Sequence, residues 1–97
     1  MSTKLEGKVA FITGASRGIG AAVARSLSNE GVKLGLASRS GADLDLPDAL
    51  GLVCDVRDLS QVERAVAATV ERFGRLDICI ANAELVSAIL PPRVSDV

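Results

Sequence analysis

The chain has 97 residues, enough for one domain at most, and a net charge of −1. Its positive residues are scattered, unlike the basic stripe of a nucleic-acid-binding protein, and no apolar run approaches the length of a membrane span. The polar N-terminal segment lacks the apolar stretch of a secretory signal, so we expect a cytoplasmic protein. The scattered charges and the lack of a long apolar run lead us to expect no nucleic-acid or membrane partner. Hydrophobic residues make up 48% of the chain but only two are aromatic, a composition typical of a parallel sheet buried on both faces.

The first half of the chain alternates between strand and helix patterns. Residues 8–13 form a short apolar run with β-branched side chains between two glycines, which predicts a buried strand. Across residues 18–30 the apolar residues recur at four-residue spacing, which predicts a helix, and Gly31 is placed to end it. Residues 32–38 predict a second strand.

The second half repeats the alternation after a loop. Residues 39–50 contain a glycine, a proline and three aspartates, which predict a loop with room for one helical turn. Residues 51–54 predict a short third strand. Asp58 is expected to cap a second long helix that ends at Gly74, with Gln61 placed as in a capping box. Residues 76–81 predict the fourth strand.

This order of elements predicts an α/β fold. Strands that alternate with helices pair in parallel through right-handed crossovers. We therefore expect part of a doubly wound, Rossmann-type parallel sheet, with about four strands in the order 3-2-1-4 and two main helices.

The cysteines and the absence of histidine limit the chemistry. Cys54 and Cys79 both lie in apolar, strand-like runs, so we expect each to be a small buried hydrophobic residue rather than half of a disulfide or a metal ligand. The chain contains no histidine, the commonest general base and metal ligand. We expect no metal site.

Residues 13–20, TGASRGIG, place three glycines between the first predicted strand and the first predicted helix. Such a turn brings backbone N–H groups and the positive end of a helix to one point, which attracts a pyrophosphate. Gly14 allows the sharp turn, Gly18 the approach of phosphates to the backbone, and Gly20 close packing of helix on strand. The glycines alone also fit an ordinary strand-to-helix turn, but the strand before and the helix after them favour dinucleotide binding.

The end of the second predicted strand indicates which dinucleotide. An NAD-preferring site normally has an acid there, whereas this chain has Ser38, Arg39 and Ser40. Arg39 can bind a 2′-phosphate through a planar fork of donors, and Arg17 is placed to reach the same phosphate. Each arginine alone also fits a solvated surface charge. Together they favour NADP over NAD, and over S-adenosylmethionine.

Three segments together resemble the short-chain dehydrogenase/reductase family. TGASRGIG resembles the family's T-G-x-x-x-G-x-G cofactor motif, and CDVRD (54–58) resembles the segment after its third strand. LDICIANA (76–83) resembles the end of its fourth strand, which leads into an Asn-Ala-Gly motif. The resemblance covers residues 4–83 and implies an NAD(P)-dependent oxidoreductase.

The resemblance also implies a set of cofactor-binding residues. They fall into groups for the pyrophosphate, the 2′-phosphate, the adenine and the nicotinamide-side ribose, in that order: Gly14, Ser16, Arg17, Gly18, Ile19 and Gly20; Ser38 and Arg39; Asp55 and Val56; Asn82 and Ala83.

The chain departs from the family's pattern after Ala83. Glu84 stands where the family has glycine, and residues 84–97 do not resemble it, so we expect a dinucleotide-binding half-domain at 1–83 and a non-family tail at 84–97. The family's catalytic Asn, Ser and Tyr-x-x-x-Lys pair follow later, and this chain has no tyrosine. We therefore expect a truncated chain that keeps the NADP-binding elements, lacks the catalytic Ser, Tyr and Lys, and alone does not turn over substrate.

Two alternatives stay open. The chain could be a non-catalytic module that binds NADP without chemistry, because the residues that would hold the cofactor are present. It could instead be an interaction fragment that pairs with a full-length relative or a second copy, because half of a doubly wound sheet leaves apolar sheet surface uncovered.

Overall fold

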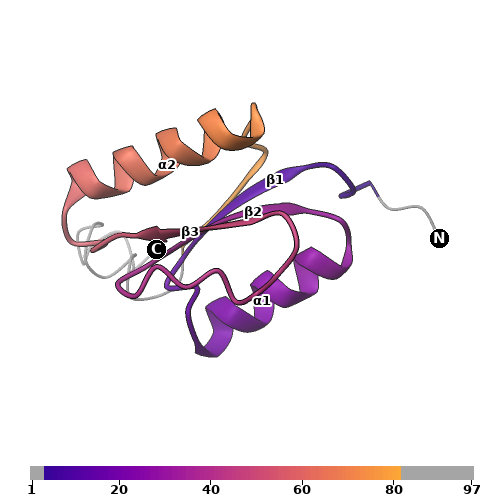
Figure 1. The fold of residues 1–97 in the computed structure, drawn as a ribbon, viewed down its shortest axis with the longest axis horizontal. Helices are drawn as coiled ribbons and strands as arrows, with labels where there is room; N and C mark the ends of the chain where they lie inside the picture. The colour runs from indigo at the N-terminus through magenta and orange to yellow at the C-terminus, as the bar shows by residue number, and fades with distance from the viewer. Residues whose placement is uncertain (1–3, 82–97) are drawn as a thin grey trace, which may run out of the picture.

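The computed structural model describes residues 4–81. Its elements follow in the order β1 (Val9–Thr13), α1 (Gly18–Asn29), β2 (Lys33–Ser38), β3 (Ala49–Val53), α2 (Leu59–Phe73) and β4 (Ile78–Ile80). The four described strands are parallel and lie in the order β3-β2-β1-β4, with α1 on one face of the sheet and α2 on the other (Figure 1). The predicted fold class and strand order are confirmed.

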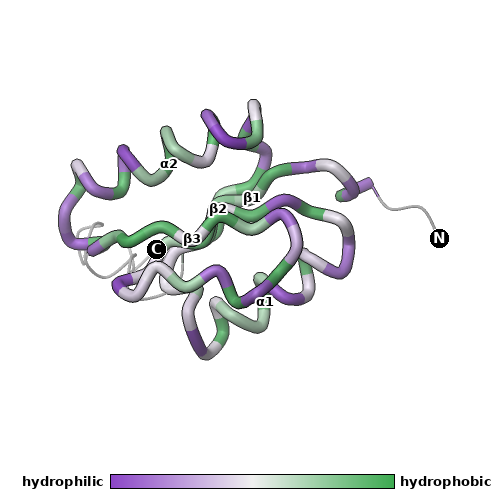
Figure 2. The backbone as a smooth tube through the Cα atoms, viewed as in Figure 1, coloured by the Kyte–Doolittle hydropathy of each residue, from purple (hydrophilic) through white to green (hydrophobic). Residues whose placement is uncertain are grey.

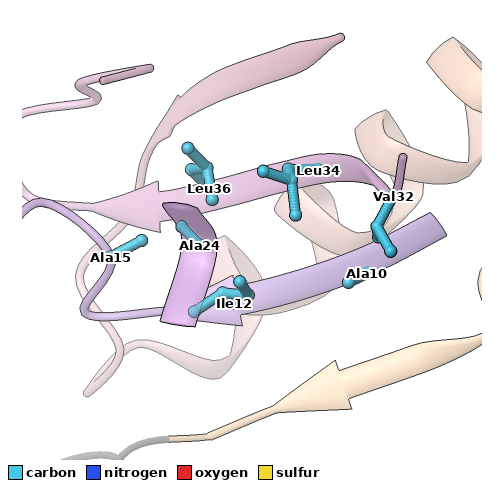
Figure 3. Close-up of a cluster of buried hydrophobic side chains, with 7 residues drawn as sticks. All are labelled: Ala10, Ile12, Ala15, Ala24, Val32, Leu34 and Leu36. Carbon is cyan, nitrogen blue, oxygen red and sulfur yellow. The ribbon is translucent and has the colours of Figure 1, made fainter. Parts of the chain in front are cut away.

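The core consists of two layers on opposite faces of the sheet. Alternate residues of β1 and β2, such as Ile12 and Leu36, are fully buried with Ala24 of α1 (Figure 3). The residues between them, such as Phe11 and Ala37, are buried under α2. In Figure 2 the hydrophobic colour follows the strands, whereas both helices alternate between hydrophobic and hydrophilic residues. The central strands are therefore buried on both sides, as their aliphatic composition predicts.

The helix ends follow the predicted signals closely. The last residue of α1 is Asn29, and Gly31 follows in the left-handed conformation, with φ of +83°. At the start of α2, the Asp58 carboxylate accepts a hydrogen bond from the backbone N–H of Ser60 at 3.0 Å. Gly74, with φ of +84°, ends this helix. The predicted caps at Asp58 and Gly74 are confirmed, whereas the C-cap of α1 is Glu30, one residue before the predicted Gly31.

Gln61 does not complete the predicted capping box. In such a box its side chain would bond back to the backbone N–H of Asp58. Instead its Oε1 atom accepts a 2.8 Å hydrogen bond from the backbone N–H of Asp55, while its Nε2 atom donates to the Asp58 carboxylate at 3.2 Å. Gln61 therefore ties α2 to the segment that leaves β3.

The connection from β2 to β3 contains no helical turn, and β3 begins at Ala49 rather than at residue 51. The early start of β3 follows from its pairing with β2. Leu34 of β2 aligns with Ala49, and the backbone N–H of Leu34 donates to the carbonyl of Asp48 at 2.9 Å. Leu44 and Asp45 have positive φ values of 57° and 54°, which turn the chain back toward the sheet. β4 is shorter than predicted and spans Ile78–Ile80.

The two cysteines lie in different environments. Cys54 is buried, as predicted, but Cys79 is exposed, so the prediction of a buried Cys79 is wrong. Cys79 lies on β4, beside Phe11, at the edge of the described sheet. The helix α2 packs on β1, β2 and β3, so the side chain of Cys79 stays open to solvent.

Candidate functional site

A cavity of about 660 Å³ opens where β1, β2 and β3 end, around the N-terminus of α1. This edge of an open parallel sheet is where ligands of α/β proteins bind. The cavity wall is formed by Gly14, Ser16, Arg17, Gly18, Ile19, Gly20, Ser38, Arg39, Ser40, Cys54 and Val56.

A second, smaller hollow of about 330 Å³ lies between β3 and α2. Arg64 and Gln61 are its polar lining residues, and the rest of its wall is apolar. The first turn of α2 contributes Gln61 to its wall, but the glycine turn, Arg17 and Arg39 are not among the residues that line it. The larger cavity is therefore the candidate site.

The glycine turn gives the cavity a positively polarised wall. Arg17 is the N-cap of α1, and its side chain makes no capping hydrogen bond. Gly18, Ile19 and Gly20 form the first turn of α1 and all line the cavity. Because the first N–H groups of a helix lack partners within the helix, this end carries partial positive charge and suits an anion.

Two of the glycines are required by the geometry for different reasons. Gly18 has φ of +62°, which L side chains rarely adopt, and a Cβ atom built on it would meet nothing within 4 Å. At Gly20 a Cβ atom would overlap the carbonyl oxygen of Gly14 and lie 3.1 Å from the Cα atom of Ala15. Gly18 thus leaves the backbone open to a ligand, whereas Gly20 allows α1 to pack against the turn.

At the end of β2, a basic residue stands between two serines. Ser38 is buried, and its Oγ atom accepts a hydrogen bond from the backbone N–H of Gly41 at 3.1 Å and lies 3.3 Å from Oγ of Ser40. Arg39 is exposed and lines the cavity together with Arg17. Among the described residues, the cavity wall therefore includes two arginines and no acidic residue.

The structure separates Asp55 from its predicted neighbour Val56. Val56 lines the cavity, but Asp55 does not. The Asp55 carboxylate is bound by Arg57, whose Nε atom donates to Oδ1 at 3.1 Å and whose Nη2 atom donates to Oδ2 at 3.0 Å. These hydrogen bonds lower the pKa of Asp55 from 3.8 to about 2.

Two cavity residues were missed by the sequence reasoning. Ser40 follows Arg39 directly, and its place in the Ser-Arg-Ser sequence was a usable signal. Cys54 directly precedes the Asp55-Val56 pair. Its burial, followed by the charges of Asp55 and Asp58, raises the pKa of the thiol, so it stays protonated at neutral pH and is a poor nucleophile.

Some predicted residues lie outside this description. Asn82 and Ala83 are beyond residues 4–81, so the structure does not describe them. Within that range, no group of three or more His, Cys, Asp or Glu residues is arranged to hold a metal ion. Neither described helix is long and apolar enough to cross a membrane.

The sequence was compared with known protein families. Residues 8–93 match the short chain dehydrogenase family. The chain belongs to this family. The match runs ten residues past Ala83, so it includes part of the segment that we assigned to a non-family tail, and the boundary at residue 83 stays a prediction.

Individual family members resemble the chain over most of its length. It is 43% identical over 89 residues to 1,6-dihydroxycyclohexa-2,4-diene-1-carboxylate dehydrogenase of Pseudomonas putida, a match that covers 84% of this chain and 33% of the relative. It is 36% identical to L-fucose dehydrogenase of Bos taurus, over 86% of this chain and 33% of that protein. The chain thus spans about a third of the length of these oxidoreductases and corresponds to the N-terminal part of the short chain dehydrogenase domain.

A solved structure of the family has the same fold. The 3-ketoacyl-(acyl-carrier-protein) reductase from Brucella melitensis, crystallised in complex with NADH, superimposes with a TM-score of 0.73. The two chains are 30% identical, and the match covers 96% of this chain and 43% of the reductase. The family resemblance predicted from three short motifs is therefore confirmed in both sequence and fold.

Proposed function

We propose that this chain binds NADP and forms the cofactor-binding part of an oxidoreductase of the short chain dehydrogenase family. The cavity at the strand ends carries the proposal, because its wall joins the N-terminus of α1 to two arginines. Partial positive charge and guanidinium groups attract phosphates. When bound, NADP would supply the hydride of the family's redox chemistry.

The pyrophosphate would lie against the glycine turn. Gly18 supports this placement, because its Cα faces open space and a phosphate could approach the backbone N–H groups of the turn. Ser16 and Ile19 would flank the pyrophosphate from the same turn. Gly14 and Gly20 would keep the turn and α1 close enough to present those N–H groups together.

Preference for NADP would come from the end of β2. An acid at this position would accept hydrogen bonds from the ribose 2′-hydroxyl of NAD and repel a 2′-phosphate. Arg39 stands there instead, exposed at the cavity wall, and can form a bidentate contact with a phosphate. Ser40 adds a hydroxyl beside it, whereas Ser38, which is buried and accepts a hydrogen bond from the N–H of Gly41, would act mainly by shaping this turn.

The remaining contacts rest on the family resemblance. Val56 lines the cavity and, with Asp55, would meet the adenine. Asn82 and Ala83 would support the nicotinamide-side ribose. This assignment keeps residues 1–83 as the dinucleotide-binding half-domain and 84–97 as a tail.

Titration of the 97-residue chain with NADPH and NADH, followed by nicotinamide fluorescence, tests the proposal. We expect tighter binding of NADPH. Arg39→Ala should weaken NADPH binding by about 10- to 100-fold, the range for a lost charge-assisted contact, and leave NADH binding nearly unchanged. No binding of either nucleotide at millimolar concentration would overturn the proposal.

Arg25 offers a matched control. It is exposed on α1 and is not part of the cavity wall, so Arg25→Ala removes the same charge away from the cofactor. We expect both affinities to stay within about twofold of those of the parent chain, since a single distant surface charge is screened by solvent and salt. Equal losses in the two variants would show a general charge effect instead of a specific contact.

We further propose that these 97 residues alone do not turn over substrate. Carbonyl reduction needs a positioned acid to protonate the substrate oxygen, and the chain has no tyrosine to serve as the family's acid. On its own the chain would then act as a non-catalytic NADP-binding module. An NADPH-oxidation assay with a panel of small carbonyl compounds tests this, and measurable turnover would contradict it.

Association is a second candidate role for the same residues. Among the described strands, β4 pairs with β1 alone, and Cys79 is exposed on it. An open strand edge can pair with another chain. Light scattering of the purified chain separates the two roles, since a monodisperse monomer that binds NADP supports the binding module. We also propose a cytoplasmic location, which fractionation of expressing cells would test.

A further inference from the structure

Asp55 lies in the chain between two residues that line the candidate cofactor cavity. Its neighbours in the chain, Cys54 and Val56, both line the cavity, and about a third of its side chain is exposed. The residues that line the cavity within the described part of the chain include no Asp or Glu. Asp55 is therefore a negative charge close to a site that we propose binds phosphates.

Two residues that follow Asp55 hold it in place, one in the turn before α2 and one in the first turn of that helix. Arg57 donates to its carboxylate from three groups, the backbone N–H at 3.0 Å, Nε at 3.1 Å and Nη2 at 3.0 Å. Gln61 accepts the backbone N–H of Asp55 at 2.8 Å. The carboxylate is thus paired with a bidentate guanidinium, and its backbone is fixed independently.

Arg57 is placed to act on the cofactor site only through Asp55. About two thirds of its side chain is exposed, and it is not part of the cavity wall. Arg39, which does line the cavity, also lowers the pKa of Asp55 through its charge, but less than the hydrogen bonds from Arg57 do. Without Arg57, the carboxylate would be free to pair with Arg39 and would repel a nearby phosphate within a Debye length of about 8 Å.

We infer that Arg57 is a positioning residue for cofactor specificity, which neutralises Asp55 and so leaves Arg39 available for the 2′-phosphate of NADP. This inference rests on the proposed function, because it requires that the cavity binds NADP. In this role Arg57 touches neither the cofactor nor the substrate. It sets the ratio of the two affinities rather than the affinity for dinucleotides in general.

The test is the ratio of the dissociation constants for NADH and NADPH at low ionic strength. Arg57→Gln should lower this ratio about fivefold, the effect expected of an exposed charge pair, by weakening NADPH binding. The double variant Asp55→Asn with Arg57→Gln should restore the ratio, because it removes the carboxylate that Arg57 neutralises. Asp55→Asn affects the adenine side of both nucleotides alike, so the ratio isolates the 2′-phosphate.

Arg75 provides a control of the same geometry. Its Nε and Nη2 atoms donate to the Asp77 carboxylate, both at 2.8 Å, so the pair repeats the two-residue spacing and bidentate contact of Arg57 and Asp55. Asp77 lies beside Val9 at the start of β1, away from the strand ends that form the cavity. Arg75→Gln should therefore leave the ratio unchanged.

Each outcome of this experiment decides something. If the parent chain binds neither nucleotide, the proposed function fails and the inference fails with it. If the parent chain prefers NADPH and Arg57→Gln keeps that preference, only the inference is overturned. If the preference falls but the double variant does not restore it, Arg57 acts on the cofactor directly and the inference is also wrong. A fall that the double variant reverses supports it.

Discussion

Thr69 of α2 lies directly over Gly35 of β2, so closely that a Cβ atom at Gly35 would overlap its hydroxyl oxygen. Thr69 is fully buried, and its hydroxyl donates to the carbonyl of Ala65 at 2.9 Å, which fixes its rotamer. The helix thus approaches the sheet as closely as a glycine permits. The close contact holds the whole of α2, including Gln61 at its N-terminus, against the strands that form the cavity.

Gly35→Ala should lower the free energy of unfolding by about 2 kcal/mol, because the added methyl group meets a side chain that cannot move aside. Urea denaturation measures this change. Thr69→Ala alone removes a buried methyl group and a hydrogen-bonded hydroxyl and should also destabilise. The double variant should lose less than the sum of the two, since each change makes room for the other. Additive losses would show that the two residues do not compete for the same space.

The fold could be predicted because its signals are local and repeated. The four-residue spacing of α1, the caps at Asp58 and Gly74, and the aliphatic strands each depend on neighbouring residues. The exposure of Cys79 could not be predicted in this way. An apolar strand looks the same in sequence whether or not a helix covers it, and here α2 packs over the neighbouring strands.

The candidate site also contains residues that could be predicted from sequence motifs and contacts that could not. The glycine turn and Arg39 were predicted because motif spacing places them at one edge of a parallel sheet, and they do line one cavity. The pairing of Asp55 with Arg57 and the contact from Gln61 were not predicted. They depend on how the chain turns between β3 and α2, and residues at that spacing could equally have pointed apart.

Substitutions of three glycines separate folding from binding. Gly7 and Gly18 both have positive φ, +82° and +62°, and a Cβ atom on either meets nothing within 4 Å. Alanine at either position should cost about 1 kcal/mol of stability through backbone strain. Only Gly18→Ala should also weaken NADPH binding, by tenfold or more, because Gly18 lines the cavity.

Gly20→Ala should lower the stability more than Gly18→Ala does, because its methyl group would overlap the carbonyl of Gly14. Its main effect should therefore be on folding, whereas that of Gly18→Ala should be on NADPH binding. Thermal unfolding and NADPH titration of the three variants measure both effects. Equal losses of NADPH affinity in Gly7→Ala and Gly18→Ala would contradict the placement of the pyrophosphate at the glycine turn.

The two thiols should react at different rates. Cys79 is exposed and should react quickly with a disulfide reagent such as Ellman's at pH 8. Cys54 is 1% exposed and its pKa is raised by burial, so little thiolate is present and its reaction should be slow. Cys79→Ser should remove the fast phase alone. Saturating NADPH should slow the Cys54 phase further, because Cys54 lines the proposed cofactor cavity. A Cys54 phase as fast as that of Cys79 would contradict its burial.

The acid sensitivity of the fold should depend in part on Asp77. Its carboxylate accepts hydrogen bonds from Arg75 and from the backbone N–H of Val9, and these lower its pKa below 3.8 in the folded chain. A group whose pKa is lowered by folding stabilises the protein above its unfolded pKa, and that contribution is lost as the pH falls through the folded pKa.

Asp77→Asn should therefore lower the melting temperature most near pH 6, and the difference from the parent chain should narrow as the pH falls below about 4. The difference in melting temperature between Arg75→Gln and the parent chain should narrow with falling pH in the same way. This variant removes the donor that contributes most to the lowered pKa of Asp77. Thermal unfolding followed by circular dichroism between pH 2 and 7 measures both series. A difference that stays constant across this range would mean that Asp77 stabilises the start of β1 through geometry alone, without its charge.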